Sequence, residues 1–293
     1  MYKRQIYIWN KKGFELFYGG TDTAEDYAAA ISSYRDKLSA DIQVYNMVVP
    51  NHSEFGLPER LRDAQGCSSQ RETTQAVYDS YTNDVIPVDI YDVLNLHNDE
   101  YLYFNTDTHW APLGAYYAYT KFCEVAKVEA AALDSMTKTT IEDFKGYLYT
   151  ATEESVLAEN PDHIDVYDVP GDFTVKLLPA GEEEFMDVDS INSPYEESFY
   201  SVFAWGDNPC LQIANQSVTN GRKLLFLKDS YGNAMAPFLA ASFEEVHVVD
   251  FRFFEGNLPA YCEEQGITDV LFFNNVMTAH NPAQVETMNT LFE

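Results

Sequence analysis

The stretch KLLFLKDSYGNAMAPFLA, residues 223–240, joins a short apolar run to a polar turn and then to a second apolar run. Residues 224–227 are all apolar, which is typical of a strand buried on both faces of a parallel sheet. Gly232 and Asn233 permit a tight turn, and the pattern after them predicts a helix. Ser230 is therefore predicted to follow the carboxyl end of a buried strand, at the edge of the sheet where such folds bind ligands.

The same alternation of short apolar runs and helical patterns occurs on both sides of this stretch. Strands are predicted at about 44–49, 86–91, 224–228, 246–250 and 270–274. Helices are predicted at about 21–39, 65–83, 111–127, 236–245 and 258–265. Strands separated by helices indicate an α/β protein with one mainly parallel sheet, covered by helices on both faces. Full burial is therefore expected for Val48, Leu225, Leu227, Val248 and Phe272.

One region departs from this alternation. Residues 141–200 are rich in Asp and Glu and contain Pro, Gly and strand-like fragments such as FTVKLL (173–178). We expect residues of about 130–215 to form an acidic insertion of loops and hairpins on a single domain that spans 1–293. The acidic run GEEEFMDVD (181–189) is interpreted as a solvated loop in preference to a calcium site.

The charge of the chain limits its partners. Asp and Glu number 47 against 18 Lys and Arg, which gives a formal net charge of −29. This charge repels phosphate backbones and anionic lipid, so no nucleic-acid partner is expected. The apolar runs are far shorter than the roughly 20 residues that cross a bilayer, so no transmembrane segment is expected in this chain. Residues 6–17 already have a strand-and-turn pattern without an apolar leader, which leaves open that the start is truncated.

The cysteines give no sign of a metal or redox site. They lie far apart, form no CxxC pair and are predicted to be free thiols. They are Cys67, Cys123, Cys210 and Cys262. We expect neither a cofactor nor a metal, although the many acids leave a metal-dependent hydrolase or phosphodiesterase as a rival hypothesis.

The segment YFNTDTHWAPLG, residues 103–114, places an acid and a histidine just before a helix that is predicted to begin at Pro112. In an extended segment Asp107 and His109 would share one face, because alternate side chains of a strand point the same way. A carboxylate that accepts the Nδ1 proton leaves Nε2 free to act as a general base. Taken alone, the pair is better interpreted as structural, tying a strand end to a helix, and Ser230 alone could equally be a helix N-cap. Together the three residues describe a hydrolase-like triad.

Four segments in this order resemble the DHHW proteins, relatives of the SGNH-type proteins that O-acetylate alginate and similar exopolysaccharides. They are TDTHWAPLGAYYAY (106–119), YSVFAWGDNP (200–209), LLFLKDSYGNAMAPFL (224–239) and VHVVDFR (246–252). The resemblance implies an SGNH-like α/β/α sandwich with permuted motif order, in which Asp107, His109 and Ser230 are catalytic. Thr108 stands where the family's name motif has its first histidine, and we expect the triad to tolerate this change because the side chain points away.

The resemblance also implies a reaction, a substrate and a location. We expect a carbohydrate O-acyl esterase or O-acetyltransferase that forms an acyl-enzyme on an acetylated glycan or polysaccharide. A membrane acyltransferase could supply the acetyl group. The protein is expected to be extracytoplasmic, at the bacterial cell surface, either secreted or anchored to the membrane through a missing N-terminal segment. The alternative is a carbohydrate-binding surface protein that kept the fold but lost turnover. Candidates for an oxyanion or substrate contact are Arg252, Asn274, Asn275 and Tyr231.

Overall fold

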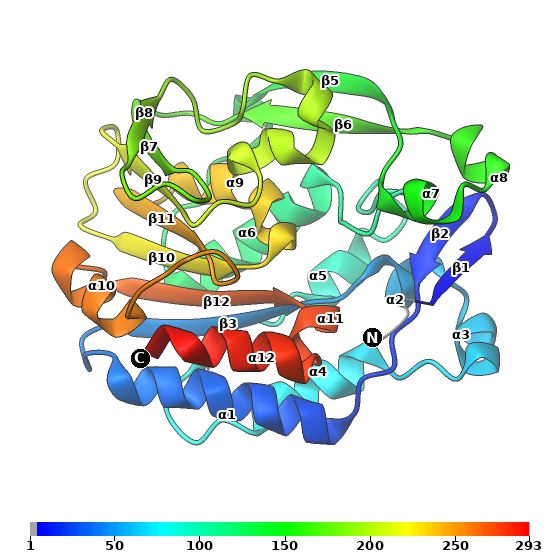
Figure 1. Ribbon diagram of the computed structural model, residues 1–293, viewed down its shortest axis with the longest axis horizontal. Coiled ribbons are helices and arrows are strands. Elements are labelled where there is room, and N and C mark those ends of the chain that lie inside the picture. Colours follow the sequence, from blue (N-terminus) through cyan, green and yellow to red (C-terminus); the bar gives the residue numbers. More distant parts are fainter. Residues whose placement is uncertain (1–4, 293) are drawn as a thin grey trace.

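A computed structural model describes residues 5–292, apart from the side chain of Ser198. Most of the chain forms one α/β unit built around an eight-stranded sheet (Figure 1). Strand order across the sheet is β4-β3-β12-β10-β11-β9-β7-β8. The bounds are β3 Gln43–Val49, β4 Ile86–Pro87, β7 Phe173–Leu178, β8 Met186–Val188, β9 Cys210–Asn215, β10 Lys223–Lys228, β11 Glu245–Asp250 and β12 Asp269–Asn275.

The sheet is mixed. The five strands from β4 to β11 run parallel to one another. Beyond β11 the pairings with β9, β7 and β8 are all antiparallel. The five predicted strands thus share one sheet, as expected, but the expectation of a mainly parallel sheet holds only for that half. The antiparallel half comes from residues 173–215, within the region predicted as an insertion, so this region extends the sheet itself.

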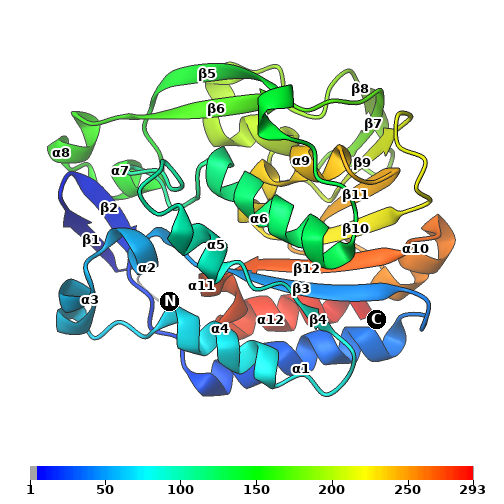
Figure 2. The same cartoon turned by 180° about the vertical axis from the view of Figure 1, so that it is seen from behind.

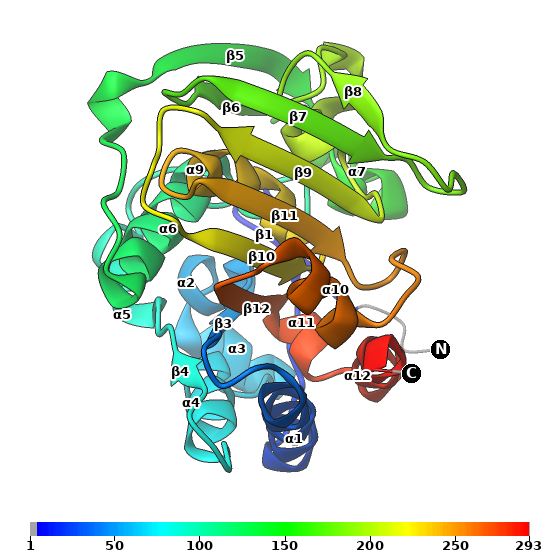
Figure 3. The ribbon, with the colours of Figure 1, turned by 90° about the vertical axis from the view of Figure 1, so that its left-hand side faces the viewer.

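Helices cover both faces of the sheet, as the alternation predicted (Figures 2 and 3). One face packs on α1, α4, α10 and α12, and the other on α6 and α9. The bounds are α1 Thr21–Lys37, α4 Gln70–Asp79, α6 Pro112–Ala126, α9 Ala236–Ala240, α10 Leu258–Gln265 and α12 Pro282–Asn289. Successive strand residues alternate between the two cores, because Leu225 and Leu227 face the first set of helices while Leu224 and Phe226 face the second. All five residues predicted to be inaccessible are buried.

Smaller elements complete the unit. In the described part of the chain, two antiparallel strand pairs lie outside the main sheet: the hairpin of β1 and β2, and the pair of β5 and β6, which α7 and α8 separate along the chain. Their bounds are β1 Ile6–Trp9, β2 Lys12–Glu15, β5 Thr137–Phe144 and β6 Asp162–Asp168. Short helices are α2 His52–Gly56, α3 Glu59–Gln65, α5 Tyr91–Leu96, α7 Tyr147–Thr152, α8 Ser155–Ala158 and α11 Val276–Ala279. The 3₁₀ segments are η1 Leu133–Ser135, η2 Glu196–Trp205, η3 Ser230–Ala234 and η4 Thr290–Phe292.

The prediction of a strand at 86–91 is wrong for most of its length. Only Ile86 and Pro87 pair with β3. Proline has no N–H to donate to a ladder, which confines it to the margin of a sheet. The side chain of Asp89 then accepts a hydrogen bond from the N–H of Tyr91 at 2.9 Å, which turns the chain into α5.

Two further expectations concern the thiols and the membrane. All four cysteines are free, and three of them are buried. Within residues 5–292, no helix combines the length and the apolar character needed to cross a bilayer.

Candidate active site

The segment that carries Asp107 and His109 is a loop, so the expectation of an extended strand is wrong there. A single antiparallel bridge between Tyr103 and Trp110 closes it, and the N–H of Phe104 donates to the carbonyl of His109 at 3.3 Å. The acid and the base meet because Asp107 turns back on its own backbone. Its Oδ1 accepts the N–H of His109 at 3.0 Å, a turn that Asp side chains favour.

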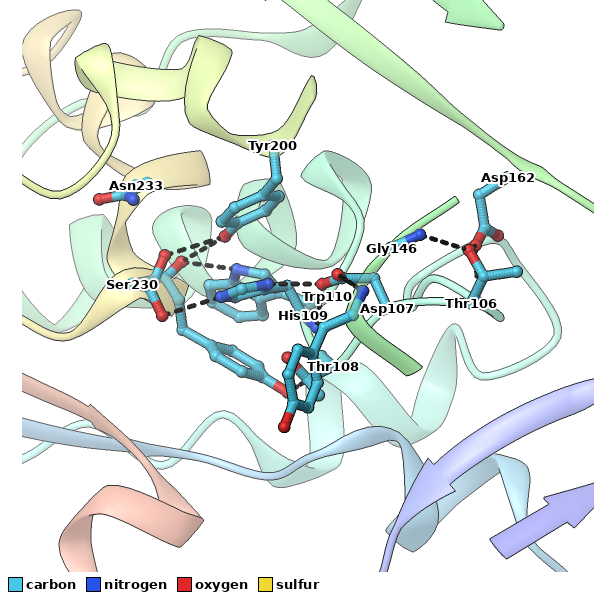
Figure 4. A network of polar contacts seen from close by, with 12 residues as sticks. Thr106, Asp107, Thr108, His109, Trp110, Gly146, Asp162, Tyr200, Ser230 and Asn233 are labelled. Atoms are coloured by element: carbon cyan, nitrogen blue, oxygen red, sulfur yellow. Dashed lines mark hydrogen bonds and ion pairs between the residues drawn. The ribbon is translucent and has the colours of Figure 1, made fainter. Parts of the chain in front are cut away.

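The structure brings the three predicted catalytic side chains into one row of contacts (Figure 4). His109 Nδ1 lies 2.5 Å from Asp107 Oδ1. His109 Nε2 lies 2.8 Å from the hydroxyl oxygen of Ser230. Ser230 is the first residue of η3, directly after Asp229 at the carboxyl end of β10. This is the geometry in which an imidazole can take a proton from a serine while a carboxylate fixes its tautomer.

The carboxylate of Asp107 is 5% exposed but remains suited to carry a negative charge. Burial raises the pKa of this carboxyl, but the charge of His109 and hydrogen bonds from His109 and from the Tyr147 N–H outweigh burial and lower the pKa below its ordinary value. The Tyr147 N–H donates to Oδ2 at 2.7 Å, while Oδ1 faces the imidazole. Gly146 lies directly against this carboxylate, since a Cβ there would come within 2.2 Å of it.

Tyr200 is a site residue that sequence analysis missed. Its ring stacks on the His109 imidazole with 3.9 Å between centroids and 14° between planes. Its hydroxyl donates to the carbonyls of Ser230 at 3.1 Å and Tyr231 at 3.2 Å. Burial, followed by the charges of nearby aspartates, raises the pKa of Tyr200 well above its ordinary value, so the phenol stays a donor. Only its place in the segment YSVFAWGDNP pointed toward the site.

Two contacts tie the acid–base loop to the serine turn. The indole N–H of Trp110 donates to the carbonyl of Tyr231 at 2.8 Å, and the Tyr231 hydroxyl donates to the carbonyl of Thr108. Residue 108 therefore contributes through its backbone, which any side chain at this position would supply. Asp229 fixes the turn, because its carboxylate accepts the N–H groups of Tyr231 at 3.0 Å and Asn275 at 2.7 Å.

The predicted oxyanion donors of Tyr231 and Asn275 already form hydrogen bonds with other groups of the protein. The N–H of Tyr231 is bound to Asp229, and its hydroxyl is bound to Thr108. The side chain of Asn275 caps α11 through Met277 N and donates to the carbonyl of Val49 at 3.2 Å.

The side chain of Asn274 lies on the face of the sheet that packs on α1, opposite the face that packs on Trp110. Its Oδ1 accepts a hydrogen bond from the Tyr27 hydroxyl at 2.7 Å. Adjacent residues of a strand point to opposite faces, and the preceding residue, Phe273, packs on the Trp110 side. Tyr231, Asn274 and Asn275 are therefore replaced as oxyanion candidates by the N–H of Ser230, which lies at the start of η3.

Arg252 is part of an ion-pair cluster beside the serine turn. Its guanidinium donates to both carboxylate oxygens of Asp250, at 2.8 and 2.6 Å, and lies 3.0 Å from Asp207. Lys228, which is 1% exposed, lies 2.7 Å from Asp250 and 3.4 Å from Asp207. The positive charge of Arg252 is thus already compensated by these carboxylates, so the structure places the predicted substrate contact in an ion-pair cluster.

The metal-ligating residue types can be surveyed over the described part of the chain. Across residues 5–292, no group of three His, Cys, Asp or Glu side chains has a geometry that could hold a metal ion. The acidic run at 181–189 is exposed apart from the half-buried Val188, but the expectation of a loop holds only in part, because Met186–Val188 form β8 and pair with β7.

Comparison with known proteins places the chain in a family. The profile of the DHHW proteins matches residues 3–249. The chain is a DHHW family protein. A solved DHHW family protein from Eubacterium siraeum is 34% identical, with a TM-score of 0.88 over 97% of this chain and 94% of that one. A comparison with curated proteins returns no match.

Two more distant solved structures share the fold of this DHHW protein. PatB1 of Bacillus cereus, solved with a sulfonyl adduct, is 20% identical, with a TM-score of 0.82 over 99% of this chain and 98% of that one. The O-acetyltransferase domain of Pseudomonas putida AlgJ is 15% identical, with a TM-score of 0.55 over 97% of this chain and 98% of that one. The expected α/β architecture agrees with both.

Proposed function

We propose that this DHHW protein is a serine-dependent O-acyl esterase or O-acetyltransferase that acts on an extracytoplasmic polysaccharide through an acyl-enzyme. The observation that carries the proposal is the contact of 2.8 Å between Ser230 Oγ and His109 Nε2, backed by the Asp107 carboxylate on the opposite ring nitrogen. The shared fold with an O-acetyltransferase domain supports the class of reaction. A protein that only bound glycans would have no use for this proton path.

In the first half of the reaction the serine becomes acylated. Ser230 Oγ attacks the carbonyl carbon of an acetyl ester while its proton passes to His109 Nε2, and Asp107 stabilises the resulting imidazolium. The carbonyl oxygen becomes an oxyanion, for which the Ser230 N–H is the candidate donor. When the carbonyl re-forms, the bond to the leaving oxygen breaks and that oxygen takes the proton from Nε2. The products are a free alcohol and acetyl-Ser230.

In the second half an acceptor removes the acetyl group. A water molecule or a sugar hydroxyl gives its proton to Nε2 and attacks the acyl carbon, and Ser230 leaves with that proton. Water makes the protein an esterase, and a sugar hydroxyl makes it a transferase. For the transferase direction, a membrane acyltransferase is the donor system that the family resemblance implies.

The test combines product release with labelling of the nucleophile. Purified protein is given an aryl acetate and an acetylated polysaccharide, and acetate release is followed in wild type and Ser230→Ala. We expect Ser230→Ala to abolish release, because the attacking atom is removed. Aryl sulfonyl fluorides react with activated serine hydroxyls, so one adduct, mapped by mass spectrometry to Ser230, is expected in wild type only.

The matched control is Ser217→Ala, which removes an exposed serine hydroxyl from the loop after β9. This variant should be labelled and should release acetate like wild type. Release by folded Ser230→Ala at the wild-type rate would remove the nucleophile assignment. Binding of the polysaccharide without any release by wild type would favour the carbohydrate-binding alternative.

A further inference from the structure

Asp162, the first residue of β6, points at the acid–base loop from outside the main sheet. Its side chain is 3% exposed. It accepts hydrogen bonds from the Thr106 N–H at 2.7 Å and hydroxyl at 2.6 Å, and from the Asn105 N–H and side-chain amide, each at 2.9 Å. The Tyr101 hydroxyl adds a further bond at 2.6 Å. One buried carboxylate therefore binds the two residues that immediately precede Asp107.

The loop depends on such side-chain contacts because it has almost no ladder of its own. Apart from the bridge between Tyr103 and Trp110, it belongs to no sheet. The carbonyls of Asn105 and Thr106 accept N–H groups of Gly13 and Tyr149, at 2.8 and 3.1 Å. The carboxylate of Asp162 accepts the N–H groups of the same two residues, so both the donors and the acceptors of this backbone segment are hydrogen-bonded. The path of the chain into Asp107 is thus fixed on both sides.

Thr106 relays this restraint to the turn behind the carboxylate (Figure 4). Its hydroxyl donates to Asp162 and accepts the Gly146 N–H at 3.1 Å. Gly146 lies against Asp107, and the next N–H, from Tyr147, donates to Asp107 Oδ2. Asp162 is therefore connected both to the loop that carries the acid and to the turn that binds it.

We propose that Asp162 is a positioning residue that sets the geometry between Asp107 and His109 without touching the reacting atoms. The proposal rests on the function proposed above. Catalytic geometry is sensitive, since a displacement of about 1 Å can cost about 10²-fold in rate. An amide at position 162 keeps the shape but turns an NH₂ group toward N–H or O–H donors, so the loop must shift.

The first experiment compares Asp162→Asn with Asp165→Asn. Asp165 lies three residues further along β6, where it binds Lys138 at 2.9 Å and Thr140 at 2.6 Å, so it makes a matched control on the same strand. We expect Asp162→Asn to lower kcat for an aryl acetate about 10- to 100-fold, with KM changed less than about twofold. The far-downfield proton NMR signal of the Asp107–His109 hydrogen bond should weaken in Asp162→Asn and persist in Asp165→Asn.

Equal kcat values for wild type and Asp162→Asn, or equal losses in the two variants, would overturn the proposal. A second pair of variants covers the case in which Asp162→Asn does not fold. Thr106→Val removes the relaying hydroxyl and should lower kcat about tenfold, whereas Thr106→Ser should restore it to within about twofold of wild type. Equal rates in this pair would also count against the proposal. If Ser230→Ala stays active, the proposed function fails, whereas an inactive Ser230→Ala beside an unaffected Asp162→Asn rejects only this inference.

Discussion

Replacing Asp107 by asparagine changes one atom of the site, and the structure fixes what that atom meets. Oδ1 accepts two N–H groups of His109, from the backbone at 3.0 Å and from Nδ1 at 2.5 Å, while Oδ2 accepts the Tyr147 N–H at 2.7 Å. An amide with its oxygen toward His109 turns its NH₂ group toward the Tyr147 N–H. The opposite orientation satisfies Tyr147 but turns the NH₂ group toward the backbone N–H of His109.

Either orientation leaves one buried N–H without its acceptor, which costs about 1–3 kcal/mol of stability. The second orientation also stabilises the imidazole tautomer that is protonated on Nε2, and this tautomer cannot take the proton of Ser230. We therefore expect turnover to fall by up to about 10⁴, the size of the loss that the same change causes in serine protease triads.

Two measurements check these magnitudes. Steady-state hydrolysis of an aryl acetate gives the loss in kcat, and urea unfolding gives the loss in stability. Asp165→Asn serves as the control for an acid-to-amide change in a surface ion pair, where about 0–1 kcal/mol is expected. Turnover of Asp107→Asn within about tenfold of wild type, at unchanged stability, would refute the orienting role of the carboxylate.

Three further predictions concern pH, the ring on His109 and the buried ion pairs. Because the folded-state pKa of Asp107 is lowered, the ionised carboxylate stabilises the fold above the unfolded-chain pKa of about 3.9, and this stabilisation is lost as the pH falls below that value. In urea titrations below about pH 4, the difference in unfolding free energy between wild type and Asp107→Asn should therefore narrow. A constant gap would contradict this. Tyr200→Phe keeps the stacked ring and should lose less than about tenfold in kcat, whereas Tyr200→Ala should lose about 10²-fold. Equal losses in the two variants would argue against positioning of His109 by the ring. Asp250→Asn leaves Lys228 buried with a weaker partner and should lower the free energy of urea unfolding by about 3–5 kcal/mol, while a loss under about 1 kcal/mol would show that the pair is dispensable.

Periodicity located the elements that build the core. Apolar runs predicted five strands of the sheet, and the helices over its two faces followed from patterns such as 21–39 and 258–265. These elements are set by burial, which a sequence records residue by residue. The direction of β7, β8 and β9 depends instead on which edge a hairpin meets, and no short-range pattern encodes that choice.

The same contrast holds at the site. Ser230, Asp107 and His109 could be predicted because each belongs to a short local motif at a strand end or a helix start. The contacts of Tyr200 and Asp162 span 91 and 56 residues, to His109 and Thr106 respectively, and their residue types are common in acidic, tyrosine-rich chains. The failure of the oxyanion predictions has a related cause. Asn275 and Tyr231 lie near the serine turn, but the Asn275 amide donates to the carbonyl of Val49 and the Tyr231 N–H donates to the capping carboxylate of Asp229.

The two outermost strands of the large sheet also bear on how the protein behaves at high concentration. An open sheet edge exposes unpaired amides, onto which a second copy can add a strand and begin aggregation. At one edge β4 pairs over two residues and ends in Pro87, and at the other β8 covers three residues after the acidic residues Glu182, Glu183 and Glu184. A short strand with proline and a short strand beside repelling charge are both poor templates. Lengthening β8 while neutralising these glutamates should therefore promote fibrils or precipitates before it affects the distant site.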